Sequence, residues 1–201
     1  MKKLLLTILL GCFALVGFSQ ARFDVKVGMS MTNLTANDET DMKVGYALGV
    51  GMDYAFNENW SFQPGIMFTG KGYKVGDVKA KAHYLDIPLL AAYKMPVADD
   101  VKFVINAGPY LAFGIGGKNK WEDEGISIST DYFGDDGAKR FDLGLQYGVG
   151  AEFSDCILLN LTGQYGFISP FEHSDSKNLA FFITLGYRLS LIHISEPTRP
   201  Y

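Results

Sequence analysis

Large apolar residues alternate with small or polar residues along much of this chain. Between Lys43 and Phe56, large apolar or aromatic side chains occupy the even positions, and mainly glycine and alanine occupy the odd ones. Since successive side chains of a β-strand point to opposite faces, this pattern predicts a strand with one large apolar face. The pattern recurs in eight segments, which are Phe23–Met31, Lys43–Phe56, Trp60–Thr69, His83–Met95, Val101–Ile115, Arg140–Phe153, Ile157–Phe167 and Leu179–Arg188.

The lengths of the connections also alternate. Short connections are expected at Asn57–Asn59, Pro96–Asp100 and Ser154–Cys156, and longer ones at Asn33–Met42, Gly70–Ala82, Gly116–Lys139 and Ile168–Lys177. Outer-membrane barrels combine an even strand number with short periplasmic turns and long external loops. We therefore predict an all-β fold, an eight-stranded antiparallel up-and-down transmembrane β-barrel, with its apolar face toward lipid. A soluble sandwich, which buries that face against a second sheet, would not require this alternation of loop lengths.

Composition agrees with strands rather than spanning helices. Hydrophobic residues make up 48% of the chain and aromatic residues 14%, yet the mean hydropathy is only +0.07 because alternation averages out. Aromatic residues gather near the predicted strand ends, as in the two interfacial belts of membrane proteins. Pro64, Pro88 and Pro109 fall inside predicted strands, where proline cannot donate a ladder hydrogen bond, so we expect bulges or kinks there.

Residues 1–21 are typical of a signal peptide. Lys2 and Lys3 precede the apolar run Leu4–Phe18, and small residues follow at a plausible cleavage site. An N-terminal membrane anchor is the alternative. Cleavage would remove Cys12 and leave Cys156 as the single cysteine, so no intramolecular disulfide could form. Export together with alternation predicts the outer membrane of a Gram-negative bacterium.

The C-terminal segment breaks the strand pattern. Leu189–Arg199 reads LSLIHISEPTR, which resembles the in-frame translation of a transposon-end adapter used in sequencing libraries. We therefore expect the barrel to comprise residues 22–188 and treat residues 189–201 as a non-native tail, so His193 and Ser195 are not catalytic candidates.

The segment Arg22–Arg188 contains 15 of the 18 basic and 21 of the 22 acidic residues, so its net charge is about −6. This charge argues against nucleic-acid binding.

Three motifs resemble the PorT-like outer-membrane β-barrel family, a porin family related to small barrels of the OmpA and OmpX type. They are YLDIPLL at Tyr84–Leu90, GPYL at Gly108–Leu111, and the DxGLxxGxGxE pattern from Asp142 to Glu152. Gly186-Tyr187-Arg188 is similar to the family's ending, although Leu189 stands where that ending has an aromatic residue. The resemblance implies a barrel over the whole mature chain, makes the three prolines family features, and leaves the role open.

The inward positions of the predicted strands carry charges. An eight-stranded barrel is just wide enough to be filled by side chains, and an isolated buried charge is costly. We therefore expect a paired polar network in the lumen, formed by Asp24, Lys26, Asp53, Asp86, Asp142, Glu152 and Arg188, with Lys102 also on the inward side. A gated pore or proton path is the alternative use of these charges.

The predicted loop Gly116–Lys139 is the longest and contains Trp121, Tyr132 and Phe133 among acidic residues. Because binding residues concentrate on loops, these aromatics form a candidate contact surface. The alternative is a loop that packs on itself. Within it, Ile126–Tyr132 has the alternation needed to extend the strands beyond the membrane.

The sequence favours an integral outer-membrane protein with a structural or surface-interaction role and no catalysis. Expected partners are outer-membrane lipid, the barrel-assembly machinery, and a surface or secretion-system protein; no cofactor or metal is expected. A narrow diffusion pore is the first alternative. A lipid-modifying enzyme is the second, and its only candidate general bases would be His83 and His173.

Overall fold

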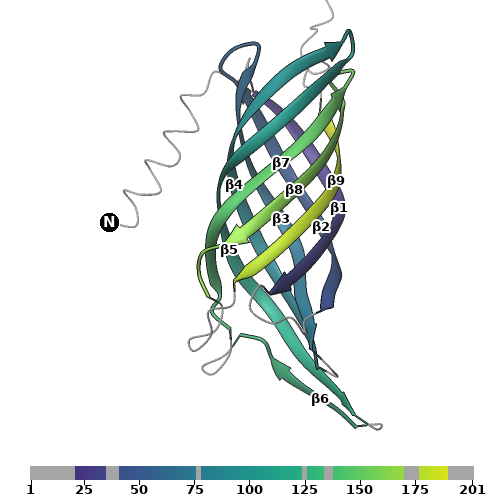
Figure 1. The fold of residues 1–201 in the computed structure, drawn as a ribbon, viewed down its shortest axis with the longest axis vertical. Coiled ribbons are helices and arrows are strands. Elements are labelled where there is room, and N and C mark those ends of the chain that lie inside the picture. The colour runs from purple at the N-terminus through teal and green to yellow at the C-terminus, as the bar shows by residue number, and fades with distance from the viewer. Residues whose placement is uncertain are drawn as a thin grey trace, which may run out of the picture.

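The computed structural model describes residues 21–34, 41–75, 78–123, 126–133, 138–169 and 177–189. These residues form almost entirely β-structure (Figure 1). The strands are β1 (Ala21–Leu34), β2 (Asp41–Ala55), β3 (Trp60–Val75), β4 (Val78–Ala98), β5 (Val101–Asp123), β6 (Ile126–Asp131), β7 (Phe141–Phe153), β8 (Ile157–Gly166) and β9 (Asn178–Leu189). None of the described residues forms a helix long and apolar enough to cross a membrane.

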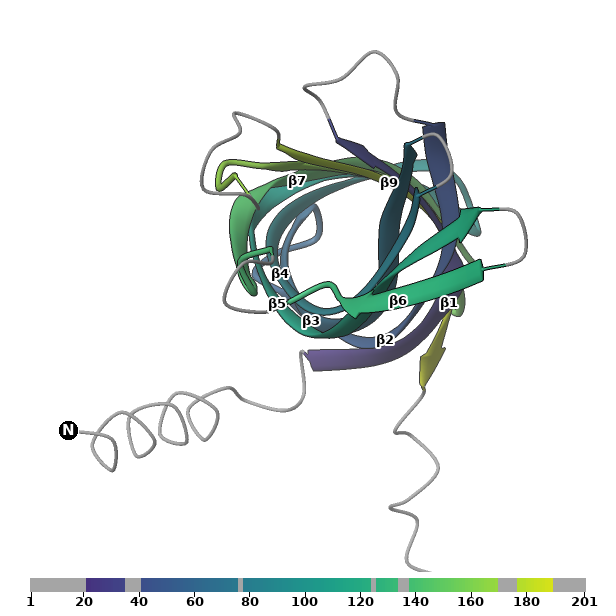
Figure 2. The same ribbon diagram turned by 90° about the horizontal axis from the view of Figure 1, so that it is seen from below.

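Eight of these strands close into an antiparallel barrel. The sheet order is β4-β3-β2-β1-β9-β8-β7-β5, and a further pairing between β4 and β5 completes the ring (Figure 2). Strand β6 pairs only with the far end of β5, from Lys118 to Asp123, and forms a hairpin that projects beyond the barrel. The predicted eight-stranded up-and-down barrel is confirmed, and closure leaves no open sheet edge among its eight strands.

Side-chain size separates the two faces of the wall. Outward positions carry exposed large apolar residues on every barrel strand, including Val27, Val50, Ile66, Tyr93, Ile105, Val149, Leu161 and Ile183. Inward positions are small or polar, and strand β9 alternates buried and exposed residues from Ala180 to Leu189. An apolar exterior around a polar interior is the arrangement of a barrel whose solvent is lipid.

Two predicted loops are largely strand. The predicted connection Gly70–Ala82 is a continuation of β3 to Val75 and of β4 from Val78, and much of Gly116–Lys139 belongs to β5 and β6. Strands β4 and β5 therefore contain 21 and 23 residues, well above the roughly 9–11 that a tilted strand needs to cross a bilayer. The expected strand extension at Ile126–Tyr132 is found as β6, which ends one residue earlier, at Asp131.

The predicted bulges at the three prolines are wrong. Pairing keeps one register across Pro64, from Gly51↔Gly65 to Tyr54↔Phe62, and Pro109 pairs in register with Leu145. Across Pro88 the register with β5 is also unchanged. Because proline has no backbone N–H, one hydrogen bond of the ladder is lost at each site. This loss does not require the extra residue that forms a β-bulge. The register shifts lie instead at Met42/Ala47, His83/Tyr84 and Pro96/Ala98.

Tight turns join the strands at one end of the barrel, which we call the turn end. The Asn57 side chain accepts hydrogen bonds from the backbone N–H groups of Asn59 (3.0 Å) and Trp60 (2.7 Å). Ser154 and Asp155 have positive φ values of 47° and 56°, a conformation that aspartate tolerates better than most residues. Aromatic pairs such as Trp60–Tyr93, with ring centroids 5.0 Å apart, lie beside these turns.

We predict that a charge at the centre of the outward face destabilises the barrel according to its depth. Leu161→Arg places a cation in the middle of β8 and should lower the free energy of unfolding by about 2–4 kcal/mol. Ile157→Arg, on the same face at the end of the same strand, should cost about 0–1 kcal/mol. Urea unfolding in phosphatidylcholine vesicles measures both. Equal costs at the two positions would contradict a lipid-facing exterior.

Candidate functional site

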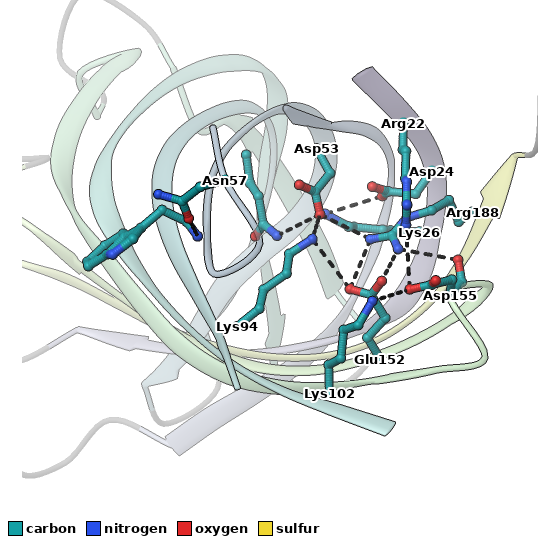
Figure 3. A network of polar contacts seen from close by, with 12 residues as sticks. Arg22, Asp24, Lys26, Asp53, Asn57, Lys94, Lys102, Glu152, Asp155 and Arg188 are labelled. Atoms are coloured by element: carbon teal, nitrogen blue, oxygen red, sulfur yellow. Dashed lines mark hydrogen bonds and ion pairs between the residues drawn. The ribbon is translucent and has the colours of Figure 1, made fainter. Parts of the chain in front are cut away.

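Four charged side chains meet across the lumen near the turn end. Asp53 comes from β2, Lys94 from β4, Glu152 from β7 and Arg188 from β9. These strands occupy every second place in the ring, in the order β4, β2, β9 and β7. Cations and carboxylates therefore alternate around the lumen. The two cations come from opposite walls of the barrel, and so do the two carboxylates. Figure 3 shows the four side chains converging on the lumen axis. All four are buried.

The contacts within this group are charge-assisted. The Arg188 guanidinium binds Glu152 in bidentate fashion, with Nη2 3.1 Å from Oε2 and Nη1 bonded to Oε1, and Nη2 also lies 3.0 Å from Asp53 Oδ2. Lys94 Nζ bonds Asp53 Oδ2 and lies 3.5 Å from Glu152 Oε2. The neighbouring pair Lys26–Asp24, with 3.3 Å between Nζ and Oδ1, extends the group. We call these six residues the turn-end network.

The turn-end network carries three carboxylates and three cations. The register pairs Asp24 on β1 with Arg188 on β9, so a negative and a positive side chain are neighbours on that wall. Removing ions from water costs several kcal/mol each unless partners compensate. A neutral, mutually bonded set meets that requirement, whereas removal of one member leaves a buried charge without its partner.

A second polar layer crosses the lumen further along the barrel. Lys71 Nζ on β3 lies 2.9 Å from Asp86 Oδ2 and donates to Gln164 Oε1 at 2.9 Å on the diametrically opposite β8. Gln164 Nε2 then donates to Gln146 Oε1 at 2.9 Å, and Thr69 Oγ1 donates to Asp86 Oδ2 at 3.2 Å. We call these five residues the mid-barrel network.

Aromatic side chains fill the lumen beyond the mid-barrel network. Tyr110 Oη donates to Asp142 Oδ2 at 3.1 Å, and Asn178 Nδ2 donates to the same oxygen at 2.9 Å. Tyr84 packs edge to face on Phe133, with ring centroids 5.5 Å apart. The Lys71 ammonium lies 5.1 Å from the centroid of the Tyr84 ring. These rings narrow the lumen on the side of Lys71 that faces away from the turn-end network.

Within the candidate contact surface of Trp121, Tyr132 and Phe133, the two side chains that the structure describes are not exposed. Tyr132 and Phe133 are buried, with 3% and 5% of their surface exposed, and their rings pack on each other 4.8 Å apart. The Phe133 ring packs on Tyr84, and Gly114 leaves room for it, because a Cβ atom there would lie 2.2 Å from that ring. The Trp121 side chain lies outside the described part of the chain.

A small cavity lies between the two networks. Its volume is about 50 Å³, and Lys26, Asp86, Asn106 and Gln164 are among its lining residues. One water needs roughly 10–15 Å³ of such space, so the cavity has room for a few waters. The described lumen is therefore filled by side chains and a small solvated space.

The structure places the predicted lumen residues in three regions. Asp24, Lys26, Asp53, Glu152 and Arg188 lie together in the turn-end network, whereas Asp86 belongs to the mid-barrel network and Asp142 to the aromatic region. Lys102 lies at the rim, where its Nζ is 2.7 Å from Asp155 Oδ1.

Sequence reasoning missed Lys71, Lys94, Gln146 and Gln164. Lys94 shares the parity of Asp86 along one uninterrupted alternating segment, and this signal would have placed it in the lumen. Lys71 was assigned to a loop, because the polar end of β3 hides its alternation. The partners of both lysines depend on register, which alternation does not determine.

The turn end carries an exposed charge cluster of Arg22, Lys102 and Asp155. Arg22 Nη1 lies 3.5 Å from Asp155 Oδ1. The hydrogen bond from Lys102, reinforced by the nearby charges, lowers the pKa of Asp155 to about 2 from its usual 3.8. About half of the Asp155 side chain is exposed, so solvent screens its contribution to stability.

The candidate general bases do not form a catalytic arrangement among the described residues. His83 Nδ1 lies 2.8 Å from the hydroxyl oxygen of Tyr46 on the outward face. His173 lies outside the described residues. Within the described residues, no group of three histidine, cysteine or acidic side chains is arranged to hold a metal ion.

The chain is similar to outer-membrane barrels in two comparisons. Residues 16–172 match the family model described as outer membrane protein beta-barrel domain. No curated protein matches the chain. Among solved structures, the outer membrane enzyme PagL aligns with a TM-score of 0.56 and 15% identity over 81% of this chain and 97% of PagL. The attachment invasion locus protein Ail of Yersinia pestis aligns with a TM-score of 0.47 and 18% identity over 85% of this chain and 99% of Ail.

We predict that Arg188 is the most costly member of the turn-end network to remove. Arg188→Met leaves Asp53 and Glu152 with Lys94 as their one remaining shared cation and should lower the free energy of unfolding by about 3–5 kcal/mol. Arg22→Met, which removes an exposed pair of the same chemical type, should cost about 0–1 kcal/mol. Denaturant unfolding of refolded protein measures both, and a cost of Arg188→Met no larger than that of Arg22→Met would contradict the network.

We predict a small acid-dependent loss of stability at the turn end. Because the folded-state pKa of Asp155 lies below its ordinary value, its stabilisation is present above pH 3.8 and disappears as the pH falls to about 2. The stability difference between wild type and Asp155→Asn should therefore shrink across this window. Asp99→Asn, in a neighbouring turn, is the control, and an equally shrinking difference there would refute the assignment to Asp155.

Proposed function

The chain belongs to the family of the outer membrane protein beta-barrel domain, and from this membership we propose that it is a non-enzymatic integral protein of the Gram-negative outer membrane with a structural or surface-interaction role. The observation that carries the proposal is the ring of Asp53, Lys94, Glu152 and Arg188, which joins four strands across the lumen. A lumen crossed by bonded side chains favours a rigid scaffold over a conduit. Function then resides on the outer surface and the projecting strands.

The proposed orientation places the turn end in the periplasm. Short turns face the periplasm and longer segments face outward in barrels of this class. The hairpin of β5 and β6 would then project from the cell and present a surface to a partner (Figure 1). Outer-membrane lipid and the barrel-assembly machinery are the partners that any such barrel requires. A surface or secretion-system protein is the further partner class, and a PorT-like role in secretion is one version of it.

A narrow diffusion pore is the competing function. For conduction, ions would have to pass both cross-lumen networks, whose members are buried except for the half-buried Lys26. The PagL alignment supports a shared fold, and PagL is an enzyme, so the fold alone does not decide against catalysis. The pairing of His83 with Tyr46, rather than with serine or a carboxylate, supports the non-enzymatic proposal.

We predict that the purified protein does not conduct. Single-channel recording in planar bilayers should show no sustained openings for wild type, because two bonded layers obstruct the lumen. The conducting control is Arg188→Ala combined with Lys71→Ala, which removes one of the three cations of the turn-end network and the cation of the mid-barrel network and should allow openings. Heat-dependent gel mobility checks that this variant is folded. Sustained openings of the wild-type protein would overturn the scaffold proposal in favour of the pore.

We predict that the two ends of the barrel label differently in intact cells. Among the described residues Cys156 is the only free cysteine, and it lies in a tight turn at the proposed periplasmic end. A membrane-impermeant maleimide should leave Cys156 unlabelled until the outer membrane is permeabilised. Asp131→Cys in a Cys156→Ser background, at the end of β6, should label at once. The reverse pattern would invert the orientation.

A further inference from the structure

The wall of the barrel is irregular where β2 meets β3. Their register shifts between Met42 and Ala47, so the usual ladder is absent beside Gly70 and Gly72. Side chains of β1 that point into the barrel hydrogen-bond the backbone of β3 at these two glycines instead. Ser30 Oγ donates to the carbonyl of Gly70 at 2.6 Å, and Thr32 Oγ1 both donates to the Gly72 carbonyl at 2.7 Å and accepts from its N–H at 2.8 Å.

A cavity of about 220 Å³ lies at this irregularity. Its lining includes Lys43, Lys71, Lys81, His83 and Tyr46, and none of its lining residues is acidic. Lys81 and His83 lie on the outward parity of β4, as shown by the intervening buried positions of Ala80, Ala82 and Tyr84. The cavity therefore combines basic groups with access from the lipid-facing side. This contrasts with a chain whose formal net charge is −4.

Aromatic side chains place the cavity at the level of lipid headgroups. Tyr46 packs 5.6 Å from Phe68 and bonds His83 through its hydroxyl, and Phe68 stacks 6.0 Å from the His83 ring. Gly70 allows this arrangement, because a Cβ atom there would lie 3.0 Å from the Tyr46 ring. Amphipathic rings of this kind are favoured at the boundary between hydrocarbon and headgroups.

Lys81 lacks a compensating carboxylate. It is exposed, and it forms no ion pair with an acidic side chain of the described residues. Its directly paired neighbour on β5 is Lys118, so two like charges share one face, and Asp131 is the next residue in that row. Like charges directly opposite each other are destabilising. By contrast, the charge of Lys71 is already balanced by Asp86.

We propose that this cavity binds the phosphate group of a membrane lipid, in the outer leaflet if the orientation in the proposed function holds. Lys81 and His83 contact the anion, with Lys43 beside it and the Tyr46 ring against the adjoining apolar part of the lipid. The volume is below the roughly 300–1,000 Å³ of pockets that enclose a whole drug-sized ligand. It therefore suits a headgroup whose chains remain in the bilayer, and access from the lipid side favours a lipid over a free anion.

Native mass spectrometry of the refolded chain in neutral detergent tests the proposal. Phosphatidic acid should be retained at one molecule per barrel, whereas diacylglycerol with the same chains and inorganic phosphate alone should not. Lys81→Gln and His83→Gln should each weaken retention, by about fivefold for the lysine because one basic residue near a lipid surface contributes about that factor. Lys139→Gln, which removes an exposed lysine of the β6–β7 connection, should leave retention unchanged.

The outcomes separate this site from the scaffold proposal. Retention of diacylglycerol at the level of phosphatidic acid would overturn phosphate recognition. Equal binding of inorganic phosphate would identify a soluble-anion site and overturn the lipid assignment. Wild-type retention by the double variant Lys81→Gln/His83→Gln, whose folding is checked by its heat-dependent gel mobility, would refute the location. If the cysteine labelling pattern is reversed, the proposed orientation is wrong and the site lies in the inner leaflet. The dependence of binding on the lipid phosphate is then still expected.

Discussion

The structure depends on one constraint, which is that backbone polar groups inside a bilayer must be hydrogen-bonded within the protein. Closing eight strands into a ring meets this constraint for nearly all of the wall. The local exceptions show how strong it is. Where β2 and β3 separate, Ser30 and Thr32 of β1 supply the missing partners from the inside. Where proline removes a donor, the strands keep their register rather than slip.

Closure in lipid also determines what the interior contains. Large apolar residues are stable on the outward face, so the charged residues of the two lumen networks lie on the inward parity. The lumen of eight strands is narrow, and its charges must therefore be neighbours. The alternating ring of Asp53, Lys94, Glu152 and Arg188 satisfies both conditions, because each carboxylate lies between two cations. A filled interior leaves the exterior and the projecting strands as the surfaces available for recognition.

The sequence was sufficient to predict the number of barrel strands, their antiparallel order and the inward parity of the seven lumen residues identified from it. Parity is a local property, and Asp24, Asp53 and Glu152 follow it directly. Register is not local, so the alignment of Arg188 with Glu152 and the separation of Asp142 from the turn-end network could not be predicted. The extension of β3 and β4 into Gly70–Ala82 was missed because the glycines and lysines of this segment obscure the alternation of large apolar side chains. Tyr132 and Phe133 were misplaced because their burial depends on the tertiary contact with Tyr84.

The central claim is that the two faces of each strand have different solvents, and nitroxide scanning along β9 in lipid vesicles measures this directly. Single cysteines from Phe181 to Leu185, in a Cys156→Ser background, carry the label. The account predicts that oxygen accessibility oscillates with a period of two residues, high at Phe181, Ile183 and Leu185 and low at Phe182 and Thr184. A uniform profile, or outward positions accessible to a water-soluble relaxation agent rather than to oxygen, would contradict it.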